Sequence, residues 1–103
     1  MLLEEVMLII NPIKEGSIVS LKLTNSEELI GKLTSKNDKE TVINRPVVLT
    51  ATRDGMTMVP FMMTADPGTH DYTFKNEHVM NCVPTNKSLA GQYIEGTTGI
   101  KLA

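Results

Sequence analysis

The stretch of residues 18–34 reads IVSLKLTNSEELIGKLT, and it decides the fold class. Apolar and polar side chains alternate over residues 18–24, which predicts a half-buried strand. Asn25-Ser26 predicts a turn, and the alternation resumes over residues 29–34 as a second strand. Gly31 lies inside this second strand, where a glycine indicates a sharp bend or a close approach of another backbone.

Further strand patterns follow this pair. Residues 41–50 are rich in β-branched side chains and predict a third strand, broken by Arg45-Pro46 at an edge or a bulge. Asp54-Gly55 is typical of a tight hairpin, and residues 56–63 predict a fourth strand. Residues 72–83 predict one or two short strands around a polar centre.

Helical patterns flank the strands. Apolar residues recur at helical spacing over residues 2–10, which favours an amphipathic helix that ends at Asn11-Pro12. A strand is the competing interpretation, because the apolar run is continuous from Val6 to Ile10. Near the other end, Thr85 or Asn86 can cap a short helix over residues 87–95, which we expect Gly96 to stop.

The 103 residues correspond to a single domain by length. Five short strands with small helices at both ends predict a mainly β fold, a small barrel or sandwich. We divide the chain into a barrel domain over residues 1–84, with the N-terminal helix, and a C-terminal helix and tail over residues 85–103.

Composition excludes several classes of protein. A hydrophobic content of 41% argues against wholesale disorder. With a net charge of −2, the chain lacks the overall positive charge typical of nucleic-acid-binding proteins. The single cysteine, Cys82, excludes an intramolecular disulfide and predicts a small buried apolar side chain. The N-terminal pattern matches no secretory signal and is too short to span a membrane, so we expect a soluble, cytoplasmic protein without a membrane partner.

Catalytic patterns do not emerge from the sequence. His70 and His78 form no metal-binding motif, and Cys82 has no partner cysteine. The adjacent pairs Glu4-Glu5 and Glu27-Glu28 are interpreted as solvated charge. We therefore predict that the protein is not an enzyme and has no catalytic residues, metal site or cofactor.

Two segments resemble the motifs of the Sm-like (LSm) family. Residues 23–33 match its first motif, an apolar strand followed by a turn and a Gly-x-Leu pair, with Ser26 in place of the turn glycine. Residues 74–79 are similar to its second motif, with Lys75 in place of arginine and no glycine. The resemblance covers residues 14–83, and the overall pattern is also similar to small Sm-like proteins of bacteriophage and marine origin.

This resemblance implies a strongly bent five-stranded barrel with an N-terminal helix across one end. It also implies a homo-oligomeric ring, in which the fourth strand of one subunit pairs with the fifth strand of the next. Single-stranded RNA would then bind at loops near the pore. The positions that carry over for RNA binding come from the second motif and from the turn and strand after the first: Lys75, Asn76, His78, Asn37, Asp38 and Asn44.

The segment 56–63 suits an oligomer interface, because it is free of charged residues and rich in methionine. The alternative is that these side chains fill the core of the monomer. The residues predicted at the interface lie on this segment and on the last strand: Met56, Met58, Val59, Phe61, Met62, Val79 and Met80.

Two functional hypotheses follow. The first is an Sm-like ring that binds single-stranded RNA weakly or selectively. The second is a ring or dimer that serves in assembly or scaffolding without RNA binding. The acidic net charge favours the second hypothesis, and the resemblance favours the first.

Overall fold

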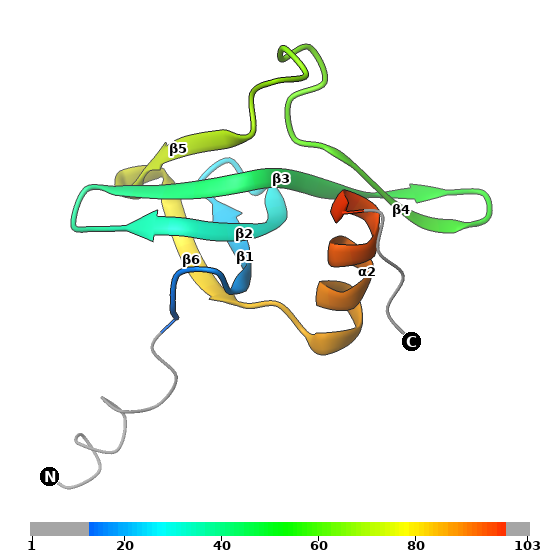
Figure 1. Ribbon diagram of the computed structural model, residues 1–103, viewed down its shortest axis with the longest axis horizontal. Coiled ribbons are helices and arrows are strands. Elements are labelled where there is room, and N and C mark those ends of the chain that lie inside the picture. The colour runs from blue at the N-terminus through cyan, green and yellow to red at the C-terminus, as the bar shows by residue number, and fades with distance from the viewer. Residues whose placement is uncertain (1–12, 99–103) are drawn as a thin grey trace, which may run out of the picture.

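The computed structural model describes residues 13–98, which form one antiparallel sheet of six strands and a C-terminal helix (Figure 1). The elements, in chain order, are β1 (Ile18–Leu23), β2 (Glu28–Lys36), β3 (Glu40–Thr52), β4 (Gly55–Pro60), β5 (Asp71–Lys75), the 3-10 helix η1 (Asn76–His78), β6 (Val79–Pro84) and α2 (Lys87–Thr98). The mainly β class predicted from the alternating patterns is confirmed.

The long strand β3 organises the sheet. The strand order is β4-β3-β2-β1-β6, and β5 also pairs with β3. The first half of β3 pairs with β5, from Glu40 opposite Lys75 onward, and its second half pairs with β4, where Thr52 lies opposite Gly55. Figure 1 shows the β3–β4 hairpin extending to one side of the molecule and β5 lying along the other half of β3.

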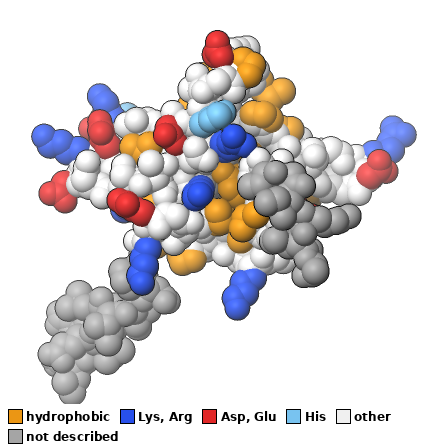
Figure 2. Space-filling model, in the orientation of Figure 1, with side chains coloured by type: hydrophobic (Ala, Val, Ile, Leu, Met, Phe, Trp, Pro, Cys, Tyr) orange, Lys and Arg blue, Asp and Glu red, His pale blue; other side chains and the backbone are white. Residues whose placement is uncertain are grey.

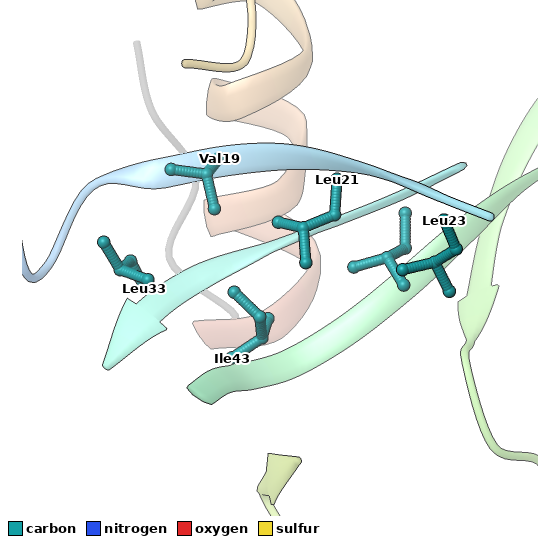
Figure 3. Close-up of a cluster of buried hydrophobic side chains, with 6 residues drawn as sticks. Val19, Leu21, Leu23, Leu33 and Ile43 are labelled. Carbon is teal, nitrogen blue, oxygen red and sulfur yellow. The ribbon is translucent and has the colours of Figure 1, made fainter. Parts of the chain in front are cut away.

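The core lies on one face of β1, β2 and β3. Val19, Leu21 and Leu23 project from β1 toward Leu33 and Ile43 (Figure 3), and Leu29 completes the cluster. All six side chains are buried, as the alternation predicts. Burying a side chain of this size stabilises the fold by about 1.5–3 kcal/mol, so this cluster is the main source of stability in the sheet.

A β-bulge interrupts β3 at the predicted place. Ile30 lies opposite Val47 and Lys32 opposite Asn44, so two steps along β2 correspond to three along β3. The extra residue lies in the Arg45-Pro46 segment, where Arg45 has a φ of +49°. Opposite the bulge, a Cβ on Gly31 would collide with the Ile43 side chain and lie 3.2 Å from the Asn44 carbonyl oxygen. The predicted close approach at Gly31 is thereby confirmed.

The predicted turns are also confirmed. Ser26 has a φ of +76°, a backbone region that favours glycine. The Asn25 side-chain oxygen accepts a hydrogen bond from the Glu27 N–H at 3.0 Å, which stabilises this turn. Between β3 and β4, Gly55 adopts a φ of +131°, as the Asp54-Gly55 signal for a tight hairpin requires.

Helix α2 begins as predicted and ends later. The Asn86 side-chain oxygen accepts a hydrogen bond from the Leu89 N–H at 2.9 Å, which confirms Asn86 as the cap. The expected stop at Gly96 is wrong, because the helix continues to Thr98. Glycine inside a helix costs only about 1 kcal/mol, and here the Arg45 guanidinium donates a hydrogen bond to the Thr97 carbonyl at 2.7 Å.

Tyr93 attaches α2 to the bulge. It is 2% exposed, and its hydroxyl lies 2.7 Å from the Asn44 carbonyl oxygen and 2.9 Å from that of Arg45. Of the described side chains of α2, it is the one that is fully buried. A bulge leaves ladder groups unpaired, and the tyrosine hydroxyl supplies the missing donor.

The expectation of a strongly bent five-stranded barrel is wrong in two respects. The sheet has six strands, and it is not closed, since β4 and β6 lie at opposite ends of the strand order. The predicted strand 56–63 ends at Pro60, and the chain leaves the sheet in a loop before β5 returns to the same edge of β3. The predicted N-terminal helix, residues 2–10, lies outside the described residues.

Replacing Gly31 should destabilise the protein. We expect Gly31→Ala to lower the free energy of unfolding by about 1–3 kcal/mol, because the added methyl group overpacks the contact with Ile43 and Asn44. Urea denaturation monitored by circular dichroism measures this change. Gly96→Ala is the matched control: its methyl group meets no atom of the described residues within 4 Å, so it should be neutral or stabilising. Equal stability of the two variants would contradict the close approach.

Replacing the tyrosine hydroxyl should change both stability and its pH dependence. Burial raises the pKa of Tyr93 to about 12, whereas an unfolded tyrosine ionises near 10. The unfolded state loses its proton first, so this tyrosine's contribution to the free energy of unfolding falls as the pH rises from about 10 to 12. We expect Tyr93→Phe to cost about 1–3 kcal/mol at pH 7. Urea titrations should show the cost shrinking between pH 10 and 12; a constant difference would contradict the burial of an un-ionised hydroxyl.

Candidate nucleic-acid interface

The turn between β2 and β3 meets η1 at one end of the sheet (Figure 1). The Asn76 backbone N–H donates a hydrogen bond to the Lys39 carbonyl at 2.8 Å, and the Asn76 side-chain amide donates to the Asn37 carbonyl at 2.8 Å. Two segments that are far apart in sequence are thus held together by one asparagine. Both are segments that the Sm-like resemblance selects for RNA binding.

Asn37 determines the shape of the β2–β3 turn. Its side-chain oxygen accepts hydrogen bonds from the backbone N–H groups of Lys39 and Glu40, each at 2.8 Å. This is the turn-forming role for which a short amide side chain is suited. Asp38, at the tip of the turn, is exposed.

The side chain of Asn76 also reaches the interior. Its oxygen accepts a hydrogen bond from the Thr41 hydroxyl at 2.7 Å, and Thr41 is fully buried. A buried hydroxyl without a partner would cost about 1–3 kcal/mol. We call the part of the sheet where the β2–β3 turn meets η1 the loop end. Asn76 holds the loop end together, and both the oxygen and the nitrogen of its side-chain amide are hydrogen-bonded within the protein.

Charges of both signs meet at this end. Lys75 lies opposite Glu40 in the β3–β5 register. The His78 imidazole lies 3.5 Å from the Glu77 carboxylate, and both side chains are largely exposed. The His78 carbonyl accepts a hydrogen bond from the Thr24 N–H at 2.9 Å, which joins η1 to the β1–β2 turn. The loop end is mixed in charge, and its basic groups are open to solvent.

Asn44 is the one predicted RNA-binding residue that the structure places elsewhere. It lies in the middle of β3, beside the bulge, and its amide donates a hydrogen bond to the Asp71 carboxylate at 3.0 Å. Thr34 donates a hydrogen bond to the same carboxylate oxygen at 3.2 Å. Asn37, Asp38, Lys75, Asn76 and His78 do share one end of the sheet.

The predicted interface residues lie at the two ends of the strand order. Met56, Met58 and Val59 belong to β4, with Phe61 and Met62 directly after it, and Val79 and Met80 belong to β6. Phe61 and Val79 pack against the core, and the Phe61 ring lies 5.4 Å from that of Phe74. Met56 and Met80 are 62% and 66% exposed. The alternative interpretation, packing in the monomer's own core, is confirmed for Phe61, and the oligomer interface stays a prediction.

Sequence reasoning did not bring together Lys32, Arg45 and His70, which line one cleft beside Tyr93. The Arg45 guanidinium donates a hydrogen bond to the Thr97 carbonyl of α2. No local signal connects these positions, because the β2–β3 register and the 61–70 loop bring them together.

Three further features of the described residues concern metal binding, the cysteine thiol and membrane-spanning helices. Residues 13–98 contain no group of three His, Cys, Asp or Glu side chains that could hold a metal ion. Cys82 is half-buried against the core, and burial raises the pKa of its thiol. Within the same residues, no helix has the length and apolar content needed to cross a membrane. No protein-family model and no curated protein matches the chain.

Removing the Asn76 amide should loosen this end of the sheet. We expect Asn76→Ala to lower the free energy of unfolding by about 1–3 kcal/mol, because the buried Thr41 hydroxyl loses its acceptor. Chemical denaturation of Asn76→Ala, Thr41→Val and the double variant measures the coupling between the two residues. Additive losses in the double variant would show that this hydrogen bond does not couple the two segments.

Proposed function

We propose that this chain is a subunit of an Sm-like homo-oligomeric ring that binds single-stranded RNA where the β2–β3 turn meets η1. The observation that carries the ring is the distribution of exposed apolar side chains. The large hydrophobic residues that stand exposed in the described chain lie on β4, directly after it, or on β6: Met56, Met62, Met63, Met80 and Val83. Exposed apolar surface of this kind marks interaction sites.

The edges of β4 and β6 also support assembly. Within residues 13–98, β4 pairs with β3 alone and β6 with β1 alone, so each strand has one unpaired edge. Neither strand contains a charged residue. Edge strands without charges invite pairing with another chain. Two different edges produce head-to-tail contacts, which close into a ring when the rotation between subunits allows it.

The first motif adds support for the Sm-like class. Ser26 stands where that motif has a glycine, and its φ of +76° is a conformation that glycine adopts without strain. Gly31 approaches the β3 backbone so closely that a side chain cannot be accommodated without a shift. Both positions therefore suit the glycines of the motif, of which Gly31 is kept and the one at position 26 is replaced by serine.

The RNA-binding part of the proposal rests on the exposed polar groups of the loop end. Lys36, Lys39 and Lys75 offer charge to phosphates, and the exposed Asn37 and His78 side chains offer contacts to base edges and faces. Asp38, Glu40 and Glu77 oppose that charge. We therefore expect weak binding that decreases as the salt concentration rises.

The alternative is an assembly or scaffolding ring without RNA affinity. One observation favours it: both ends of the Asn76 amide are already engaged, by Thr41 and by Asn37. The net charge of −2 points the same way.

Native mass spectrometry of the purified protein, with and without a short uridine-rich RNA, tests both hypotheses. We expect a closed oligomer that retains RNA at low salt. Met56→Glu and Met80→Glu should dissociate it to monomers, because each places a charge on an exposed apolar edge. Lys75→Gln should weaken RNA binding and leave the oligomer intact.

Ser88→Glu, at an exposed position near the start of α2, is the matched control and should leave the oligomer unchanged. A wild-type monomer at micromolar concentration would refute the ring. An intact oligomer that ignores RNA at low salt would refute RNA binding and favour the scaffolding alternative.

A further inference from the structure

A cleft of about 620 Å³ lies beside the bulge of β3, at a place separate from the loop end described above. Lys32, Asn44, Arg45, His70, Tyr93 and Thr97 are among the residues that line it. Its volume falls within the range of sites that take small molecules, which is about 300–1,000 Å³. Apolar side chains of Ile18 and Ile94 complete its wall, so it offers both a polar and an apolar part.

Three basic side chains converge on this cleft. The strand register places Lys32 opposite Asn44, the neighbour of Arg45. The Arg45 backbone N–H donates a hydrogen bond to the His70 carbonyl at 2.6 Å, which brings the 61–70 loop against the bulge. Figure 2 shows basic side chains near the centre of this face, close to an apolar area and with acidic side chains nearby. Among the described residues that line the cleft, none is acidic.

The Arg45 guanidinium is anchored to the end of α2. One of its N–H groups donates to the Thr97 carbonyl at 2.7 Å. A guanidinium carries five N–H donors in a planar fork, so further donors are available. The ion pairs Lys22–Glu28 and, when the imidazole is protonated, His78–Glu77 do not involve Arg45.

The β3 bulge also fixes the backbone of Arg45. Its φ of +49° lies in the left-handed region, which costs a residue with a side chain roughly 1–2 kcal/mol. Such strain is concentrated at functional sites, where it holds a side chain in a required position. The strained residue here is Arg45, which lines the cleft.

Two features near the cleft weaken the binding of an anion there. The Asp71 carboxylate lies beside the cleft, bound by the Asn44 amide and the Thr34 hydroxyl. The Thr97 carbonyl belongs to the C-terminal end of α2, the negative end of the helix dipole. The ligand must therefore carry more than one negative charge, or several acceptor atoms, to be held.

We propose that this cleft binds a small phosphate monoester. Such a group has close to two negative charges and three terminal oxygens at neutral pH, which match the donors of Lys32, Arg45 and His70. The planar fork of arginine binds two phosphate oxygens at once. The apolar wall beside the basic residues accommodates the organic part of the ester. This site is distinct from the proposed RNA-binding end and does not depend on ring formation.

Isothermal titration of the full chain with uridine monophosphate tests the proposal, with uridine and inorganic phosphate as comparison ligands. We expect the monophosphate to bind and uridine not to bind. Arg45→Gln should weaken binding about tenfold or more, the loss that a charge-assisted hydrogen bond implies. Lys32→Gln should also weaken it. Lys22→Gln, which removes an exposed lysine outside the cleft, is the matched control.

Circular dichroism establishes that each variant is folded, and the exposed Lys32→Gln keeps the test decisive if Arg45→Gln unfolds. Absence of monophosphate binding at millimolar concentration would overturn the proposal. So would equal weakening by Lys22→Gln and Lys32→Gln. Binding of an RNA without terminal phosphate, combined with no monophosphate binding, would overturn it and make the cleft a contact for phosphodiesters.

Discussion

The close approach of β2 and β3 at Gly31 is the constraint on which the rest of the structure depends. Because the position opposite the bulge has no side chain, Ile43 packs into the core directly against the β2 backbone. The bulge in turn divides β3 into two halves that bind β5 and β4 along the same edge. It also leaves the Asn44 and Arg45 carbonyls to Tyr93, which attaches α2. Core, strand order and helix position thus follow from one local irregularity.

The exposed apolar side chains and the basic side chains lie in different parts of the described molecule. The loop end carries Asn37 and the exposed basic groups, the ends of the strand order carry Met56 and Met80, and the cleft carries Lys32, Arg45 and His70. In the ring that we propose, subunits would meet at β4 and β6, and the turn residues 37–39 lie outside both strands. The proposed assembly and the proposed ligand binding would therefore use different parts of one subunit.

Local patterns predicted most of the elements because their causes are local. The alternation around Leu21 has a period of two, and an amide at Asn86 can cap a helix by its own geometry. Predictions failed where a distant contact decided the outcome. Gly96 does not stop α2, because Arg45, far away in the sequence, binds the carbonyl of Thr97. The sheet does not close into a barrel, because β4 and β6, at the two ends of the strand order, do not pair with each other.

The features of the candidate sites also fall into two groups, those that local sequence determines and those that distant contacts decide. The sequence alone determined that Asn37 lies in a turn, that Arg45-Pro46 interrupts a strand, and that the segment around Met58 is apolar and uncharged. Tertiary structure decided that Asn76 is engaged by Asn37 and Thr41, and that Lys32, Arg45 and His70 share a cleft. The physical reason is the distance along the chain over which each effect acts. Turn propensity and alternation act over a few residues, whereas a bulge shifts the register of whole strands and selects which distant side chains meet.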